Sequence, residues 1–541
     1  MIVSILIFIY PAKTLLYVYL EKRADYILST TGTPTVSVAS RLLAMKLDNK
    51  PATINMAFRV LNVWKENGYL LHIIIALSLL LNTVIAMNAP LMHYEAHYGL
   101  YGRFPALSYV DHPPMVGWLQ YLALLFSKTD FALRIAPLLL VTASQYLIAR
   151  IACRLFIDKT GWLGIVSVLL LQGTAIFRLT FTMSPELPFL LTGLLVFYSY
   201  LQILEHDRLK DWLLLGTCLG VAGLSKYTAV TLIPSVLLVL SLHFRLQLFF
   251  KPGLWLSALV AIVLITPVVI WNLEHDWASF AFQSSYQFNA KPDPFTGLSS
   301  AILQQVGAYS PLLFIATITA PRTLWQQGQQ SAVIRALAFT LPIFLLFTVL
   351  SISGRSSSHW TLLAWVLSAP MAACWLLSQW SMNRVKVLTW FSGTLSILTI
   401  IASLLIIWPG NHLLFNKNPL AQLTGWPEAS ARAQTLYREY APESMQGKAW
   451  IFVRNWHYGG LLGWYNSNLS IVNPEKQSAY QLWYGQPSVQ SAGILVIAKR
   501  KAVEPNATLE GFQCKPVSQY LASRSDKVVN YFYFYYCTSY D

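Results

Sequence analysis

"LLHIIIALSLLLNTVIAM", residues 70–87, is the first of several long apolar stretches in the chain. It contains no Lys, Arg, Asp or Glu, and its length is close to the roughly 20 residues that a helix needs to cross the hydrocarbon core of a bilayer. Stretches of the same kind recur at 135–152, 254–271 and 387–408. Because a single segment can satisfy its own backbone groups in lipid only as a helix, this repetition predicts an all-α polytopic membrane domain.

The composition of the chain agrees with this prediction. Of its 541 residues, 55% are hydrophobic and only 11% are charged, which is unlike an ordinary soluble domain. The formal net charge of +15 does not indicate nucleic acid as a partner, because Lys and Arg are scattered through short loops and the tail. Cations placed in this way are typical of loops that orient a membrane protein and contact anionic membrane lipids.

The apolar stretches predict about eleven to thirteen transmembrane helices in total. Eleven of them are assigned between residues 69 and 408, near 69–88, 131–153, 162–178, 187–204, 211–224, 228–244, 253–272, 300–320, 335–352, 359–380 and 387–408. An odd number of spans places the loop after the first span on the same side as the C-terminal tail. Loops on the other side carry more Lys and Arg, so the positive-inside rule predicts that this loop and the tail are extracytoplasmic.

The chain is expected to have three regions. Residues 1–68 form an N-terminal extension that could add a span, and residues 69–408 form the transmembrane domain, with an outer loop at 89–130. Residues 409–541 are expected to form a small extracytoplasmic α/β domain. In this last region "KAWIFVRN", "AGILVIAKR" and "NYFYFYYC" are typical of short strands, and "EASARAQTLYREYA" has helical spacing.

Two of the five cysteines, Cys514 and Cys537, lie in the predicted outer tail. An oxidising compartment would allow them to form a disulfide, and we predict that they do. The alternative is two unrelated free thiols.

The first outer loop concentrates polar and aromatic residues in "MHYEAHYGLYGRFPALSYVDHPPMVGWLQ", residues 92–120. Four other segments on the same predicted side carry further polar groups: Glu186 in "TMSPEL", Lys226 in "GLSKYTA", Asn272 and His275 in "WNLEHDWASFAFQSSYQF", and Arg355 and His359 in "SGRSSSHW". Taken singly, several have ordinary explanations, such as a first-turn acid, a snorkelling lysine or an interfacial histidine. Their convergence on one face favours a functional site, because ionisable groups at membrane depth are costly.

The mixture of residue types indicates an anionic, lipid-linked substrate. Lys, Arg and His side chains would bind a phosphate through charge-assisted hydrogen bonds, and a carboxylate would act on an acceptor. Aromatic rings would suit sugars and prenyl chains, although packing at a membrane interface explains most of them equally well.

Across "YEAHYGLYGRFPALSYVDHPPMVGWL", "TMSPELPFLL", "GLSKYTA", "WNLEHDWASFAFQ" and "SSSHW", within residues 69–380, the chain resembles a family of membrane enzymes. These are the C-type membrane glycosyltransferases of the aminoarabinose lipid A transferase and dolichyl-phosphate-mannose protein mannosyltransferase superfamily. The resemblance implies the C-type glycosyltransferase fold and transfer of a sugar from a polyprenyl-phosphate-linked donor. The acceptor would be lipid A in lipopolysaccharide, another envelope glycan or protein, at the outer face of the cytoplasmic (inner) membrane.

The resemblance also assigns roles to residues of this chain. The expected catalytic residues are Glu95, Asp111 and Glu186, and the expected substrate-binding residues are Tyr98, His112, Lys226, Asn272, His275, Arg355 and His359. A divalent metal that bridges Asp111 and the donor phosphate is a further hypothesis. The chain departs from the family at Tyr94-Glu95-Ala96, where the pattern usually reads Asp-Glu-Ala. If that Asp activates the acceptor, then Glu95 or Asp111 substitutes for it, the acceptor needs little activation, or the protein is inactive.

Three other functions remain open from the sequence. One is a protein O-mannosyltransferase-like enzyme, and another is a flippase or transporter, which would bind the same phosphate without chemistry at the carboxylates. An internal inverted repeat would favour transport, and none is visible in the sequence. The third is a noncatalytic relative that binds a lipid-linked sugar, for which Tyr94 is the argument.

Overall fold

The computed structural model describes residues 50–288, 294–352, 357–407, 421–441, 449–474, 479–486, 492–502, 505, 507–524 and 527–539. The chain divides into two compact units, residues 1–70 with 159–161, and residues 71–158 with 162–541. In the first unit the structure describes the beginning of helix α4 (Lys50–Asn88) and the short segment 159–161. Residues 1–49 of the N-terminal extension, which could add a span, lie outside the described residues. Every feature discussed below belongs to the second unit or to α4.

Among the described residues, eight helices are long and apolar enough to cross a membrane. They are Gly68–Asn88 of α4, α7 (Ala132–Leu155), α9 (Glu186–His206), Tyr227–Phe250, α12 (Pro252–Glu274), α16 (Gln330–Ser351), Ser358–Ser378 and Asn383–Leu405 of α18 (Asn383–Ile407). Tyr227–Phe250 comprises η2 (Tyr227–Thr231), α11 (Leu232–Phe244) and η3 (Arg245–Phe250), and Ser358–Ser378 comprises η4 (Ser358–Thr361) and α17 (Leu362–Ser378). The prediction of an all-α polytopic membrane domain is therefore confirmed.

Three of the eleven predicted spans take a different form. The stretch 162–178 folds as the short helices α8 (Trp162–Gln172) and η1 (Ile176–Leu179), and 211–224 as α10 (Leu209–Ser225). The stretch 300–320 falls on a 105° bend between α14 (Pro294–Tyr309) and α15 (Pro311–Gln326), a pair that makes a ninth span if it is counted as one. At this bend Ser310 has a φ of 68°, and Pro311 follows it, which disfavours helical geometry at the preceding residue.

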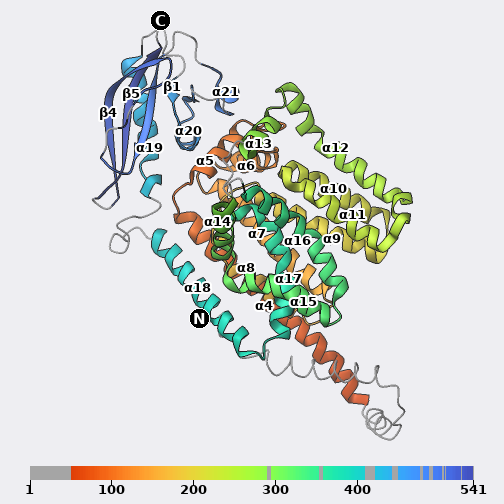
Figure 1. Ribbon diagram of the computed structural model, residues 1–541. Coiled ribbons are helices and arrows are strands. Elements are labelled where there is room, and N and C mark those ends of the chain that lie inside the picture. The colour runs from red at the N-terminus through yellow and green to blue at the C-terminus, as the bar shows by residue number, and fades with distance from the viewer. Residues whose placement is uncertain are drawn as a thin grey trace. The chain divides into compact units, whose positions relative to one another are not determined.

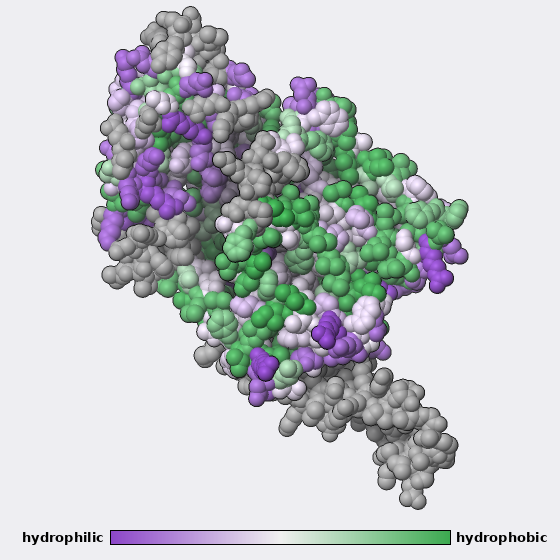
Figure 2. All heavy atoms as spheres, in the orientation of Figure 1, coloured by the Kyte–Doolittle hydropathy of each residue, from purple (hydrophilic) through white to green (hydrophobic). Residues whose placement is uncertain are grey.

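The long helices expose large apolar side chains. Leu80 is 60% exposed, Ile262 65% and Leu398 55%, whereas α17 is almost entirely buried among its neighbours. Figure 2 shows apolar surface over the helices on the visible face and hydrophilic surface over the C-terminal domain. This distribution is that of helices whose outer faces contact lipid.

The first outer loop folds into two short helices, α5 (His93–Arg103) and α6 (Met115–Phe126). α5 ends before Pro105, and α6 begins after the Pro113-Pro114 pair, as expected for a residue that tolerates only the first turn of a helix. The turn between them is held by α13 (Ala278–Phe288): Ser279 Oγ donates to the Tyr109 carbonyl (2.9 Å), and Gln283 Nε2 to the Asp111 carbonyl (2.6 Å).

The C-terminal domain contains a five-stranded sheet and three α-helices in its described residues (Figure 1). The strand order is β2 (Leu469–Val472), β1 (Ala449–Phe452), β3 (Ala492–Lys499), β5 (Lys527–Ser539) and β4 (Phe512–Arg524), parallel across the first three and antiparallel across the last three. The helices are α19 (Trp426–Tyr440), α20 (Trp456–Tyr465) and α21 (Ala479–Tyr484), and η5 (Ala421–Leu423) precedes them. The three predicted strands and the predicted helix are confirmed as β1, β3, β5 and α19.

The C-terminal domain and the outer loop share one hydrophobic core. Ala96 and Leu100 of α5 belong to the same buried cluster as Trp464 of α20 and Ile471 of β2. α20 approaches α5 closely at Gly460, where a Cβ atom would lie 3.1 Å from the backbone nitrogen of His97. Figure 1 shows α20 next to α5. The loop and the tail therefore lie on the same side of the membrane domain, as predicted.

Cys514 on β4 pairs with Cys537 on β5 in a disulfide, the pair that the sequence predicts. The bridge closes a loop within the hairpin of these two strands.

Replacing both cysteines by serine is expected to lower the free energy of unfolding of the C-terminal domain by about 2–4 kcal/mol, because the unfolded chain is then less constrained. Thermal unfolding of the purified protein with and without reductant checks this. The Cys153→Ser variant is the control, since that thiol is free.

Candidate active site

Asp111 lies in the turn between α5 and α6 with both carboxylate oxygens in contact with polar groups. The Tyr101 hydroxyl donates to Oδ1, and His97 Nε2 lies 3.5 Å from Oδ2. Partial burial alone would raise the pKa of Asp111, but His112, His97 and Tyr101 together hold that pKa well below its usual range. Burial and the neighbouring carboxylate raise the pKa of Tyr101, so its hydroxyl keeps the proton that it donates. Asp111 is therefore an ionised, oriented carboxylate whose side chain is 22% exposed.

His112 connects this carboxylate to a second group of charged residues. Burial lowers the pKa of His112 below its ordinary value of 6.5, and the opposing effect of Asp111 does not restore it. At neutral pH the ring is therefore uncharged and offers an N–H donor rather than a cation. The charges of Glu186 and Lys226 also act on the pKa of His112, which places the loop carboxylate and the second group in one electrostatic neighbourhood.

The second group joins three segments that are far apart in the sequence. Glu186 is the first residue of α9, where a carboxylate favours the helix N-terminus, and Lys226 follows α10. Lys226 Nζ donates to Glu186 Oε1 at 2.9 Å, and both side chains are buried. His359 Nε2 lies 3.6 Å from the same carboxylate oxygen, and this imidazole is 45% exposed. The result is a buried ion pair with a histidine at its accessible edge.

Of the other predicted substrate-binding residues, Tyr98 lies next to His112, whereas Asn272 and His275 lie at the end of α12. The ring of Tyr98 is 5.9 Å from that of His112, and the residue is buried. Asn272 is fully buried at the end of α12, where its Oδ1 accepts from the backbone nitrogen of Ser279 (3.2 Å). His275 stacks on Trp271 at 4.1 Å. Asn272 and His275 thus shape the turn before α13, and their role in substrate binding stays a prediction. Arg355 lies outside the described residues.

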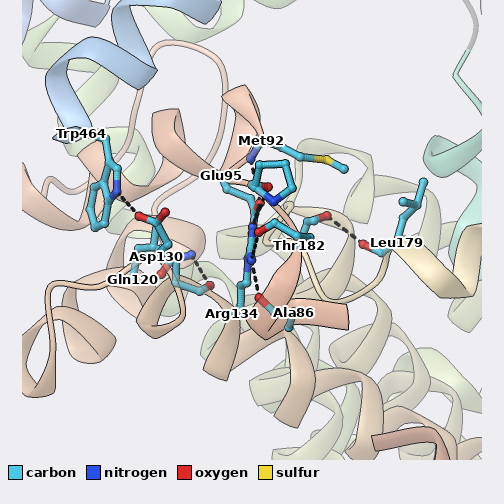
Figure 3. A network of polar contacts seen from close by, with 12 residues as sticks. Ala86, Met92, Glu95, Gln120, Asp130, Arg134, Leu179, Thr182 and Trp464 are labelled. Atoms are coloured by element: carbon cyan, nitrogen blue, oxygen red, sulfur yellow. Dashed lines mark hydrogen bonds and ion pairs between the residues drawn. The ribbon is translucent and has the colours of Figure 1, made fainter. Parts of the chain in front are cut away.

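Glu95 lies in surroundings that differ from those of Asp111, and Figure 3 shows it beside Arg134. It is fully buried and makes a bidentate pair with Arg134 of α7, with N···O distances of 2.8 and 2.9 Å. Its Oε2 also accepts from the Met92 backbone nitrogen (3.0 Å) at the start of α5. The remaining N–H groups of the guanidinium donate to the backbone carbonyls of Ala86, Ala89 and Pro90. Glu95 therefore ties the end of the first span to α5, and its assignment as a catalytic residue stays a prediction.

The position at which the chain departs from the family, Tyr94, lies at the contact with the C-terminal domain. Its side chain is 45% exposed, and its ring lies 5.7 Å from the rings of Trp456 and His457 on α20. A tyrosine here adds to an interdomain aromatic contact, where an aspartate would add a charge.

No metal centre is formed by the residues that the structure describes. Within them, no group of three or more His, Cys, Asp or Glu side chains could hold a metal ion.

Several residues of the site had not been assigned from the sequence. His97 and Tyr101 are four residues apart on α5, so a helical reading of this segment would have placed both on one face. Tyr480 lies on α21 of the C-terminal domain, and its hydroxyl contacts His97 Nδ1 at 3.4 Å. Arg134 lies inside a span. A charged residue inside a span is itself a sequence signal, whereas Tyr480 carries none.

Comparison with known proteins gives one family match. The family model for dolichyl-phosphate-mannose-protein mannosyltransferase matches residues 111–271, a segment that contains Asp111, His112, Glu186 and Lys226. No curated protein sequence matches this chain significantly.

The structure is similar to solved structures of ArnT and, at a lower TM-score, of an archaeal oligosaccharyltransferase. ArnT from Cupriavidus metallidurans bound to undecaprenyl phosphate has a TM-score of 0.58 at 13% identity, covering 86% of this chain and 98% of that one. Its apo state gives a TM-score of 0.56 at 14% identity over the same shares. The archaeal oligosaccharyltransferase AglB from Archaeoglobus fulgidus gives 0.45 at 12% identity, covering 79% of this chain and 69% of that one. Residues 111–271 are therefore similar to this mannosyltransferase family, and the chain shares the fold of ArnT over most of its length.

Proposed function

We propose that the chain is an inverting membrane glycosyltransferase that moves a sugar from a polyprenyl phosphate to an acceptor at the outer face of the cytoplasmic membrane. The single observation that carries this proposal is the juxtaposition of an oriented carboxylate, Asp111, with the Lys226–Glu186–His359 group through His112. A carboxylate suits the acceptor, and an ammonium with imidazoles suits the donor phosphate.

On the donor side, Lys226 and His359 would bind the phosphate, with His112 as a neutral N–H donor. The bond between the anomeric carbon and the phosphate oxygen breaks, and the electron pair stays on the phosphate. Cationic donors held in place before the reaction stabilise this developing charge without reorganising. Glu186 fixes the ammonium of Lys226 at 2.9 Å, which supplies that pre-organisation. Arg355 is proposed from the sequence as a further phosphate ligand.

On the acceptor side, Asp111 would orient the attacking oxygen and take its proton. The new bond forms between this oxygen and the anomeric carbon, on the face opposite to the leaving phosphate, so the configuration inverts. A carboxylate with a strongly lowered pKa is a weak base. Together with Tyr94 at the usual Asp position, this property supports an acceptor that is easily activated, such as the monoanion of a phosphate monoester, whose remaining proton has a pKa of about 6. A phosphorylated lipid A or another phosphate-bearing envelope glycan fits this chemistry.

The proposed orientation follows from two independent features. The predicted opposite-side loops hold more Lys and Arg, which the positive-inside rule places in the cytoplasm. The Cys514–Cys537 disulfide suits an oxidising compartment, and the C-terminal domain that contains it packs on α5 of the outer loop.

A noncatalytic protein that binds lipid-linked sugar is the second candidate, and Tyr94 is the observation that favours it. Such a protein would bind polyprenyl phosphate as the enzyme does but would release no product. A protein acceptor, as in the O-mannosyltransferases, would change the product and leave the donor side as described.

The donor side can be tested by binding undecaprenyl phosphate to the purified protein. Replacing Lys226 by Met is expected to weaken this binding at least about tenfold, because a hydrogen bond to a charged group contributes about 1.5–3 kcal/mol. The Lys226→Met/Glu186→Gln double variant should bind equally weakly, and it leaves no unpaired buried carboxylate.

Lys251→Met is the matched control for this binding measurement. Lys251 also forms an ion pair, with Asp207, but that pair lies beyond the other end of the 21-residue helix α9, about 30 Å from Glu186. Equal affinities of the Lys226 and Lys251 variants would contradict the proposed phosphate site.

A further inference from the structure

The C-terminal domain reaches Asp111 through one histidine. His97 of α5 is buried, with its Nε2 3.5 Å from Asp111 Oδ2 and its Nδ1 3.4 Å from the hydroxyl of Tyr480. The same Tyr480 hydroxyl donates to the backbone carbonyl of Trp456 at 2.6 Å. A continuous chain of polar contacts therefore runs from the C-terminal domain to the carboxylate.

The number of protons on each group determines which groups donate and which accept along this series of contacts. Burial raises the pKa of Tyr480 well above its usual range, so the hydroxyl keeps its single proton, which is directed to the Trp456 carbonyl. The hydroxyl oxygen can then only accept from His97 Nδ1. An ionised Asp111 likewise only accepts. Both ring nitrogens of His97 thus face oxygen atoms, one on Tyr480 and the other on Asp111.

Aromatic rings surround the imidazole of His97 on its other sides. Five ring centroids lie 4.9–6.0 Å away, those of Tyr98, Tyr101, Trp456, Tyr480 and Trp483. The last three belong to α20 and α21 of the C-terminal domain. The C-terminal domain thus supplies three of the five rings that enclose this buried imidazole.

The position of α20 against α5 is itself anchored at a second point. Arg103 at the end of α5 donates to the backbone carbonyls of Gly463 and Trp464, each at 2.7 Å, and its guanidinium lies 4.4 Å from the Trp464 ring. The carbonyls at the end of α20 thereby gain a cationic partner, which suits the negative end of a helix. These contacts hold the C-terminal domain in place against α5, so that a residue of this domain can position a residue of α5.

We propose that the C-terminal domain completes the active site, with Tyr480 acting through His97 to hold the Asp111 carboxylate in the orientation that activates the acceptor. His97 and Tyr480 are positioning residues in this scheme, and neither touches the substrate. The inference rests on the proposed function, since it assigns the domain a part in the same reaction.

The test is a double-mutant cycle on the full-length protein in membranes, with the initial rate of transfer to the acceptor glycan as readout. His97→Leu and Tyr480→Phe should each lower kcat, by about 10- to 100-fold and about tenfold, and leave the affinity for undecaprenyl phosphate unchanged. Because Tyr480 acts through His97, the double variant should be no slower than His97→Leu alone. His97→Gln keeps an N–H donor toward Asp111 and should recover part of the rate.

Tyr465→Phe is the matched control, because its hydroxyl lies at the same interface but donates to Asp130 (3.0 Å) instead of contacting His97. Its rate should stay close to that of the unaltered protein. Additive losses in the double variant, or equal rates for Tyr480→Phe and Tyr465→Phe, would overturn the inference. Asp111→Asn in the same series tests the proposed function separately. If this variant retains sugar transfer, the enzyme mechanism is rejected. If it loses sugar transfer while the His97 and Tyr480 variants remain fully active, only the positioning role is rejected.

Discussion

Replacing Asp111 by Asn is expected to lower the rate of sugar transfer by about 10²–10⁴-fold while undecaprenyl phosphate still binds. The amide keeps the shape of the carboxylate and can still accept from Tyr101, but it cannot take the proton of the acceptor. The lowered pKa of Asp111 means that the carboxylate is ionised across the neutral range, so the loss should be similar at every pH between about 6 and 8. Initial rates in membranes, together with binding to the purified protein, measure both effects.

Asp130→Asn is the control for this substitution. Asp130 lies in the same outer loop but accepts from Trp464 Nε1 and the Tyr465 hydroxyl at the contact with α20. Its variant should stay within about tenfold of the unaltered rate, since one amide oxygen still accepts a hydrogen bond and no proton transfer is involved. If the Asp111 and Asp130 variants are equally active, Asp111 does not act on the acceptor.

Replacing Glu95 by Gln is expected to destabilise the protein by about 3–5 kcal/mol. Glu95 and Arg134 are both fully or almost fully buried, and removing one partner leaves a buried charge without its counter-ion. The loss should appear as a lower temperature of unfolding of the purified protein, followed by size-exclusion chromatography after heating. Replacing both residues, as in Glu95→Met/Arg134→Met, should recover part of the stability, because no unpaired charge remains.

Glu205→Gln provides the contrast for a pair at the surface. Glu205 binds Arg154 with side chains 45% and 20% exposed, so its loss should cost about 0–1 kcal/mol. If Glu95→Gln instead abolished transfer without changing the temperature of unfolding, Glu95 would be a catalytic carboxylate and the structural role inferred from its contacts would be wrong.

Much of the fold could be predicted from the sequence because lipid imposes a simple rule on composition. Eight of the eleven assigned spans correspond to single membrane-length helices among the described residues. The rule fails where a break interrupts an apolar stretch. The stretch 300–320 was assigned as one span, although it contains Gln304 and Gln305 and bends at Ser310. In the C-terminal domain, β5 was evident from its aromatic run, whereas β4 alternates exposed and half-buried residues and has no apolar signature.

The candidate site was predictable in part, for a physical reason. Lys226 and Glu186 stand out in the sequence because an ionisable group near a span is conspicuous, and the structure pairs them. Tyr480 could not be found in this way, since one more tyrosine in an aromatic-rich domain carries no signal until the fold brings it to His97. Glu95 is the opposite case. The sequence motif marks it as a catalytic candidate, but the structure pairs it with Arg134, 39 residues further along the chain.

The central claim is tested most directly by comparing the masses of the envelope glycolipids, lipid A and its core included, from three strains. One carries the intact gene, one a deletion, and one the deletion complemented with Asp111→Asn. The account predicts that a single sugar-sized mass is present in the first strain and missing from both others, although the variant protein is present in the membrane. A product that persists in the Asp111→Asn strain and is lost only in the deletion would contradict the mechanism, and identical glycolipids in all three strains would contradict transfer to these acceptors.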